Sequence, residues 1–278
     1  MRVLIMTDLE GVSGITDWDA HEPMTPQDQW QRTLMTGEIN AAVAGAFDAG
    51  ATRVKITEGH NAIDILQLDE RATLVPARYP ASPVLTGWDE GLDALLMIGK
   101  HAMAGTPDGV LAHTGNRGVE FVEINGIRVG ESGTEAAEAG DYGFPTVMIS
   151  GDVAACREMQ ELLGDIEVAP VKTGYDCHHA DCLHPNVARR LIREKVRTAL
   201  ERLDDFKPFV IPGPISLVQC LKEPISEETL ARQQEKPWVE VVDERTLAFK
   251  GQNVVEAFAR RCGLDYTWPG RATTDEHG

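Results

Sequence analysis

The sequence predicts an α/β fold: a mainly parallel or mixed sheet with flanking helices, followed by a smaller α+β C-terminal part. Apolar runs of strand length alternate with helix-like segments up to residue 185. From residue 186, a charged amphipathic helix and two long apolar runs replace that alternation. The 278 residues suffice for one or two domains of about 150 residues each. We therefore expect a first domain over 1–185, a smaller region over 186–266 and a flexible tail over 267–278.

The first elements follow from an apolar run and from residues typical of helix ends. The run Arg2–Thr7 is mainly apolar and stops at an acidic loop, as a buried strand does. Thr25 suits the N-cap of the following helix, and Pro26 suits its first position. Gly50 is a stop signal that ends this helix after Ala49. Further strands are expected over 53–57 and 94–98.

A turn dipeptide marks the middle of the chain. Asn125-Gly126 separates two apolar runs, which predicts a hairpin with strands over 119–124 and 127–129. An Ala/Glu-rich helix over 134–139 and a strand over 146–150 then complete the first domain. In the C-terminal region we expect, in order, a helix over 186–203, strands over 210–221 and 238–249, and a helix over 252–262.

The charge excludes several classes of partner. With 44 acidic and 26 basic residues, the net charge of −18 makes nucleic acids and anionic membrane surfaces unsuitable main partners. No apolar run approaches the roughly 18 residues of a membrane span, and the N-terminus does not match a signal peptide. Five cysteines, an odd number, favour reduced thiols. These features predict a cytoplasmic protein without a nucleic-acid or membrane partner.

Metal-competent side chains follow four separate strand ends: Asp8 with Glu10, then His60, His101 and Glu131. Glycines beside them permit tight turns. In open α/β sheets, ligands bind beyond the carboxyl ends of the strands. Three carboxylates and two imidazoles suit Zn²⁺, with Mn²⁺ or Co²⁺ as alternatives. Five ligands exceed the three that one catalytic zinc usually takes, which favours two metals that share a carboxylate.

Each of these residues also has a simpler possible role. Asp8 suits a turn cap, Glu10 a solvated loop acid, and Glu131 a helix cap near Thr134. A lone histidine is more often structural than metal-binding. Their joint placement at strand ends favours a metal site, but spacing alone leaves both interpretations open.

Several motifs resemble those of a known family. They are Asp8-Leu9-Glu10-Gly11-Val12-Ser13-Gly14, Glu58-Gly59-His60, Gly99-Lys100-His101-Ala102, His113 and Val129-Gly130-Glu131. In order and spacing they resemble the bacterial zinc-dependent D-aminopeptidases of the dipeptide-transport operon type. The resemblance is clear over residues 1–185 and weaker to about residue 265, and it makes 1–185 the metal-binding catalytic domain.

The resemblance implies roles for individual residues. Asp8, Glu10, His60, His101 and Glu131 correspond to ligands of two zinc ions per subunit, with the aspartate bridging. His113 corresponds to the catalytic residue, as a nucleophile or a general acid/base. The resemblance also implies an α/β subunit that forms a homo-oligomer, a homodecamer of two stacked pentameric rings with active sites facing an inner channel.

The function predicted is therefore metal-assisted hydrolysis of amide bonds, most simply as an aminopeptidase that releases N-terminal D-amino acids from short peptides. The segment 114–118 differs from the family pattern, so an amidohydrolase of a small non-peptide amide metabolite is the alternative. A metal-binding protein without turnover and a two-metal phosphoesterase are less favoured. The absence of G-x-S-x-G, P-loop and G-x-G-x-x-G motifs gives serine hydrolases, NTPases and dinucleotide enzymes no support.

Two features stand outside this set. The segment 177–184 carries Cys177 and Cys182 with interleaved histidines, which suits either an inert loop or a structural zinc site. Lys172 ends an apolar run, which fits an ordinary surface lysine or a buried or site-facing cation.

Overall fold

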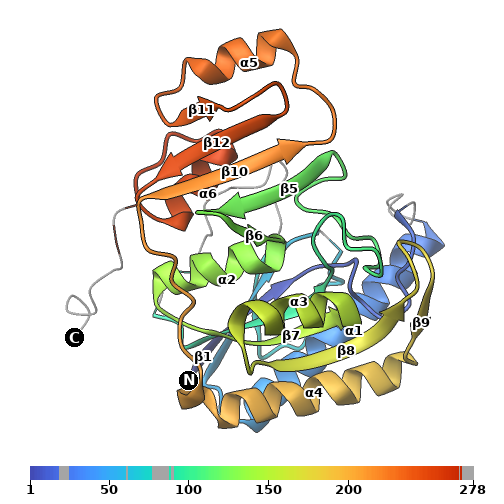
Figure 1. The fold of residues 1–278 in the computed structure, drawn as a ribbon. Helices are drawn as coiled ribbons and strands as arrows, with labels where there is room; N and C mark the ends of the chain where they lie inside the picture. Colours follow the sequence, from blue (N-terminus) through green and yellow to red (C-terminus); the bar gives the residue numbers. More distant parts are fainter. Residues whose placement is uncertain (19–24, 61, 77–87, 89–90, 269, 271–278) are drawn as a thin grey trace.

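The computed structural model describes residues 1–278 except 19–24, 61, 77–87, 89–90, 269 and 271–278. Most of the predicted tail over 267–278 therefore lies outside the described residues. The fold combines a large sheet between helices with a smaller sheet beside it (Figure 1). This is the predicted class, α/β with an additional α+β part, and it is confirmed.

The larger sheet has seven strands. Their order is β3 (Thr73–Val75), β2 (Arg53–Glu58), β1 (Arg2–Thr7), β4 (Ala94–Lys100), β7 (Thr146–Asp152), β8 (Glu167–Gly174) and β9 (Ala180–Cys182). Neighbours pair in parallel, except that β9 is antiparallel to β8. The central strands β4 and β7 are buried along their whole length. Because parallel strands end at the same edge, the loops after β1, β2 and β4 meet there.

Helices cover both faces of this sheet. On one face, α1 (Pro26–Asp48) and α4 (Pro185–Glu201) pack side by side. On the other lie α2 (Glu131–Tyr142) and α3 (Val153–Leu163). Adjacent residues of β1 divide between the two layers, because side chains of a strand alternate: Ile5 packs in the first core and Leu4 in the second.

The smaller sheet has five antiparallel strands. Their order is β11 (Val239–Val241), β12 (Thr246–Gly251), β10 (Ile215–Leu221), β5 (Val119–Ile124) and β6 (Ile127–Val129). The helix α6 (Val254–Arg261) packs against this sheet and against α2. The short helix α5 (Glu227–Gln234) lies beyond β11 at the outer end of the molecule, and a 3-10 helix spans Leu203–Asp205 (Figure 1).

Most predicted elements occur close to their expected bounds. Thr25 caps α1 by accepting a hydrogen bond from the Asp28 amide at 3.1 Å. The hairpin turn has the left-handed backbone it requires, with φ of 49° at Asn125 and 83° at Gly126. Other expectations were wrong in detail. The helix predicted over 134–139 already begins at Glu131, and the strand predicted over 238–249 is two strands separated by a turn.

Sheet membership does not follow the predicted boundary at residue 185. The β5–β6 hairpin lies within 1–185 but joins the C-terminal strands, because β5 pairs with β10. Conversely, α4 follows residue 184 but packs against α1 and β8. The division into 1–185 and 186–266 as separate domains stays a prediction.

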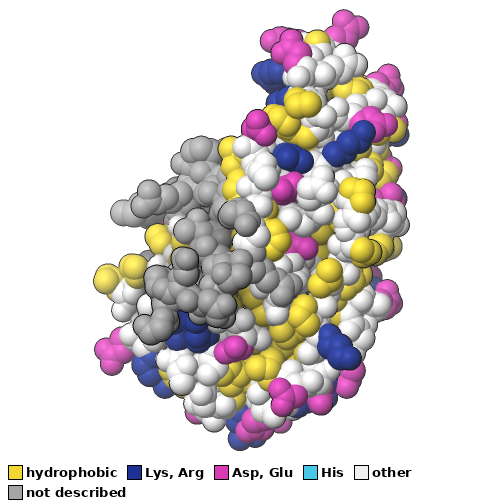
Figure 2. Space-filling model, turned by 90° about the vertical axis from the view of Figure 1, so that its left-hand side faces the viewer, with side chains coloured by type: hydrophobic (Ala, Val, Ile, Leu, Met, Phe, Trp, Pro, Cys, Tyr) yellow, Lys and Arg dark blue, Asp and Glu magenta, His cyan; other side chains and the backbone are white. Residues whose placement is uncertain are grey.

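The negative charge is spread rather than concentrated on the face shown in Figure 2. Acidic and basic side chains are interspersed there, with hydrophobic side chains between them. Within the described part of the chain, no helix is both long enough and apolar enough to cross a membrane.

Candidate active site

The sequence-predicted residues converge at the carboxyl edge of the larger sheet. Asp8 follows β1 directly, His60 lies two residues after β2, and His101 follows β4. Glu131 is the first residue of α2, to which the chain returns from the β5–β6 hairpin. The structure thus brings together donors from four segments, as the strand-end pattern predicts.

The donor atoms form two neighbouring groups. In the first, His60 Nδ1 lies 3.2 Å from Asp8 Oδ1 and 3.3 Å from Glu10 Oε2. In the second, His101 Nε2 and His113 Nε2 each lie 3.5 Å from Glu131 Oε1. The other oxygen of Asp8, Oδ2, is 3.5 Å from His101 Nε2. The two oxygens of Asp8 therefore face different groups.

These distances and the unpaired atoms fit a bound cation. Ligand bonds of about 2.0–2.1 Å in tetrahedral geometry place donor atoms about 3.3 Å apart. Glu10 Oε2 and His101 Nε2 are buried and have no hydrogen-bond partner among the described residues. Buried polar atoms are nearly always paired. The oxygen and nitrogen donor set is one that zinc accepts.

The histidine rings are oriented by the backbone. His101 Nδ1 contacts the Ala102 carbonyl at 3.0 Å, and His113 Nδ1 contacts the Leu111 carbonyl at 2.9 Å. With Nδ1 facing a carbonyl, each ring presents Nε2 to the site, where a neutral ring offers a lone pair. The His113 ring stacks on that of His101 with centroids 4.0 Å apart. The Trp18 ring is nearly perpendicular to the His113 ring, with centroids 5.1 Å apart.

Burial and charge act in opposite directions on the two acids after β1. Burial alone would raise the pKa of Asp8, but the positive charges of Lys100 and of nearby histidines hold this pKa well below its usual value. Burial, and then the charge of Asp8, raise the pKa of Glu10 to about 8. One carboxylate is thus firmly ionised, while its neighbour takes up a proton unless another cation is present.

Burial and nearby charges also shift the pKa values of the histidines. Burial disfavours the charged form of His60 and His101, but the carboxylates overcome it and raise their pKa values to about 9 and about 10. Burial opposes ionisation of Glu131, but the charge of His101 lowers its pKa to about 2. For His113, burial and the charge of His101 both lower the pKa. His113 is therefore the imidazole that the site keeps neutral.

Glycines allow the two central loops to touch. The Gly11 amide donates to the Gly99 carbonyl at 2.8 Å, and the Asp8 amide donates to the Ile98 carbonyl at 2.9 Å. A Cβ at Gly11 would lie 2.0 Å from the Lys100 carbonyl oxygen. Gly99 has φ of +76°, and a Cβ there would lie 2.2 Å from the Asp8 carbonyl oxygen. Side chains at either position would separate the loops that carry Asp8 and His101.

A buried lysine beside Asp8 was not among the predicted site residues. Lys100 Nζ donates to Glu135 Oε1 at 2.7 Å and lies 3.5 Å from Asp8 Oδ2. Nearby carboxylates outweigh burial and raise the pKa of Lys100. The signal in the sequence is a cation at the last position of a strand that is otherwise apolar. Lys100 fixes Asp8 in place.

Lys172 stabilises the loop after β1 through hydrogen bonds to its backbone carbonyls. Its buried ammonium donates to the carbonyls of Glu10, Val12 and Ile15, at 3.2 Å for Val12 and 2.6 Å for Ile15. The adjacent Ser13 amide donates to Glu38 Oε1 at 3.0 Å. Of the two predicted possibilities for Lys172, the buried cation is confirmed.

Replacing Lys172 with methionine is expected to destabilise the fold and loosen the loop that carries Asp8 and Glu10. Three carbonyls would lose their donor, at about 1–3 kcal/mol for each buried group that stays unpaired. Urea unfolding of the metal-free variant should show a lower midpoint than the wild type. An unchanged midpoint would contradict this role. Lys195→Met, which removes a partly buried lysine paired with Glu167 at 2.8 Å, is the control.

The segment 177–184 does not form a metal-binding group among the described residues. His179 instead pairs with Asp176 at 2.9 Å, and the Tyr175 hydroxyl donates to Asp181. Cys177 and Cys182 are free thiols. Part of the predicted loop is a strand, since β9 lies within this segment and pairs with β8.

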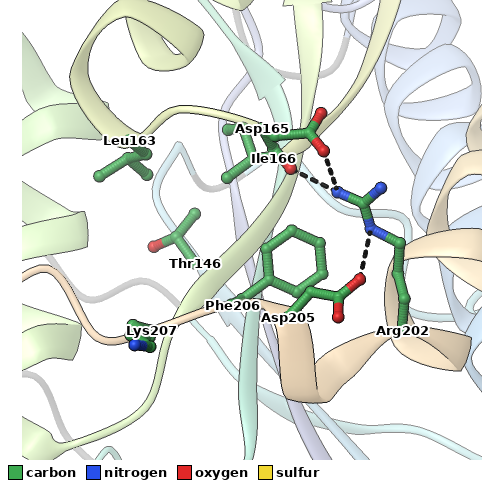
Figure 3. A pocket seen from close by; sticks show the side chains of 8 residues that line it. All are labelled: Thr146, Leu163, Asp165, Ile166, Arg202, Asp205, Phe206 and Lys207. Atoms are coloured by element: carbon green, nitrogen blue, oxygen red, sulfur yellow. Dashed lines mark hydrogen bonds and ion pairs between the residues drawn. The ribbon is translucent and has the colours of Figure 1, made fainter.

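A hollow at the opposite end of the larger sheet contains an arginine that is already paired with acids. It lies at the starts of β7 and β8, where Arg202 points toward two acids (Figure 3). Arg202 Nη2 is 3.0 Å from Asp165 Oδ2, and Nε is 3.8 Å from Asp205 Oδ2. The guanidinium is thus already neutralised.

Known proteins resemble this chain in both sequence and fold. The model of the D-aminopeptidase family matches residues 1–261. A D-aminopeptidase of Bacillus subtilis (strain 168) is 33% identical over 215 residues, which cover 76% of this chain and 78% of that protein. The Zn-dependent D-aminopeptidase DppA from Bacillus subtilis, described as a self-compartmentalizing protease, matches structurally with a TM-score of 0.85 at 28% identity. That match covers 96% of this chain and 100% of the DppA chain.

The fold, the donor set and these similarities define a metal-dependent hydrolase, of the metallopeptidase class. The chain belongs to the D-aminopeptidase family of peptidases. The resemblance drawn from the sequence motifs is thereby confirmed.

Proposed function

We propose that the site holds two zinc ions per chain, with Asp8 bridging them. Glu10 and His60 would complete one set of ligands, and His101 and Glu131 the other. The observation that carries this proposal is that Asp8 Oδ1 faces His60 at 3.2 Å while Oδ2 faces His101 at 3.5 Å. The donor set also accommodates Mn²⁺ or Co²⁺. Bound ions of this kind polarise a carbonyl and lower the pKa of water.

His113 is proposed as the catalytic residue. Its Nδ1 contacts a backbone carbonyl, so its neutral ring presents the Nε2 lone pair to the site beside Glu131. A positioned imidazole can accept a proton from the attacking group and return it to the leaving amine. Trp18 and His101 pack against the ring and limit its rotation. The same Nε2 could also attack the scissile carbonyl directly, so both chemical roles suit this placement.

The substrates proposed are short peptides with an N-terminal D-residue. The names of both relatives support this class, and DppA, which is Zn-dependent and self-compartmentalizing, supports a zinc site inside an assembled particle. We propose that this chain also assembles, as a homodecamer of two stacked pentameric rings. The cytoplasmic location also stays a prediction, and it is supported by five cysteines that are all free thiols.

A panel of substrates tests the function directly. The protein, loaded with zinc, manganese or cobalt, is given D- and L-aminoacyl amides, D- and L-dipeptides and plain non-peptide amides. We expect kcat/KM for D-residues to exceed that for L-residues by at least about 100-fold, about 2.7 kcal/mol of transition-state discrimination. Equal rates for both enantiomers would contradict the proposed specificity. Exclusive hydrolysis of plain amides would instead support the alternative amidohydrolase.

A further inference from the structure

A guanidinium from the end of the chain lies beside the candidate site. Arg261 is the last residue of α6, and its Nε donates to Gln219 Oε1 on β10 at 2.5 Å. Within the described part of the chain, the terminal nitrogens Nη1 and Nη2 make no hydrogen bond. The side chain is partly buried, and among the described residues its only hydrogen-bond partner is a neutral amide. The guanidinium also lies over the Phe258 ring, 5.6 Å from its centroid.

One glycine connects this arginine to the proposed metal ligands. A Cβ at Gly115 would lie 2.7 Å from Arg261 Nη2, so the guanidinium packs directly on the backbone there. The Gly115 amide donates to Glu131 Oε1 at 2.6 Å. Glu131 Oε1 is in turn 3.5 Å from His113 Nε2. Gly115 therefore lies between Arg261 and the proposed ligand Glu131.

The charge of Arg261 is incompletely compensated. Burial lowers its pKa, and Cys262, Glu131 and Glu138 oppose this through their charges; the described contacts include no ion pair of Arg261. A partly desolvated cation without an anionic partner is unfavourable. A carboxylate from a ligand would supply that partner, because the planar fork of arginine matches a carboxylate in two parallel hydrogen bonds.

We propose that Arg261 binds the C-terminal carboxylate of the substrate and thereby selects dipeptides and similarly short peptides. This inference rests on the proposed function. A residue spans at most about 3.3–3.6 Å, so a carboxylate held beside Gly115 belongs to the residue that follows the scissile bond. Longer peptides would have to place a neutral amide against the guanidinium. Arg261 is a specificity-determining residue in this scheme.

Arg117 is the rival cation. Its guanidinium lies over the ring of Trp18 at 5.4 Å, within the segment 114–118 that departs from the family pattern. Arg117 is exposed, however, so water solvates its charge and no ligand is needed to compensate it. The geometry favours Arg261 because it is partly buried and held in place by Gln219.

Binding without turnover tests the inference independently of catalysis. Calorimetry on the zinc-loaded His113→Ala protein measures Kd for D-alanyl-D-alanine and for its C-terminal amide. We expect the acid to bind at least about 10-fold more tightly, because only the carboxylate can form paired charge-assisted hydrogen bonds with the guanidinium. Arg261→Gln in this background should remove the preference, and Arg261→Lys should retain part of it.

The active enzyme provides a second measurement. Arg261→Gln should raise KM for the acid at least about 10-fold and leave KM for the amide unchanged, with kcat altered less than KM. Arg260→Gln is the matched control, since the neighbouring arginine on the same helix donates to the Lys250 carbonyl at 2.7 Å, away from the site. Zinc content and Tm of each variant show whether the site remains assembled.

Three outcomes would overturn the inference. One is equal binding of acid and amide by the starting protein. Another is an equal rise in KM for both compounds in Arg261→Gln, which is the effect of a merely structural residue. A third is loss of the preference in Arg117→Gln but not in Arg261→Gln. A clear preference in binding, without hydrolysis of any peptide by the wild-type protein, would support Arg261 while contradicting the proposed function.

Discussion

Replacing His113 with alanine is expected to lower kcat for D-aminoacyl substrates by about 10²–10⁴-fold, the contribution typical of a positioned general acid or base. KM and the proposed zinc content of two per chain should change little, because alanine leaves the proposed ligands intact. Steady-state kinetics together with metal analysis of the purified variant makes the measurement.

Metal analysis also separates two roles for this histidine. His113, His101 and Glu131 form a group whose donor atoms lie within 4.8 Å of one another, so His113 itself has the position of a ligand. Loss of one zinc per chain in His113→Ala would identify it as a ligand and contradict the catalytic role. Undiminished kcat would contradict both. Trp18→Leu, which keeps the imidazole but removes its edge contact, should lower kcat far less.

Replacing Asp8 with asparagine is expected to reduce metal content below one ion per chain and kcat/KM by at least about 10³-fold, because metal ions supply several kcal/mol of transition-state stabilisation. Only this side chain faces both donor groups among the described residues. The loss of its charge also leaves Lys100 with Glu135 as its remaining bonded acid. Zinc titration of the apo-variant and peptide hydrolysis provide the readouts.

Two further variants make this test specific. Glu10→Gln should lose one ion and retain the other, because Glu10 belongs to the first group alone. Asp48→Asn should retain both ions, since Asp48 pairs with Arg193 at 2.6 Å on the surface. Retention of two ions by Asp8→Asn, or equal loss in Asp8→Asn and Glu10→Gln, would contradict a bridging aspartate.

Strand ends made the candidate site predictable. Asp8, His60 and His101 each follow a strand whose apolar run is visible in the sequence, and parallel strands end at one edge. Glu131 was predictable for the same local reason, although the structure places it at the first turn of α2 rather than in a loop before that helix. An apolar run and the residue that follows it can be recognised locally in the sequence, without knowing which strands will pair.

The groups that support the site carry no such local signal. Glu135 lies on a helix whose charged residues suggest a solvated face, yet it is buried against Lys100. Arg261 reaches Gly115 from the far end of the sequence, and only the packing of α6 against the smaller sheet brings them together. The Asn125-Gly126 dipeptide identified a hairpin, but nothing in it indicates that β10 is the neighbour.

The β5–β6 hairpin lies between His113 and Glu131, and its neighbour β10 is synthesised much later. β5 and β6 pair with each other in the smaller sheet, and β10, the other neighbour of β5, follows only after α2, α3 and α4 have been made. A chain emerging from the ribosome thus carries Asp8, His60 and His101 on a nearly complete sheet while the segment that ends in Glu131 still lacks its support. We therefore expect the site to be completed only after β10 has been made.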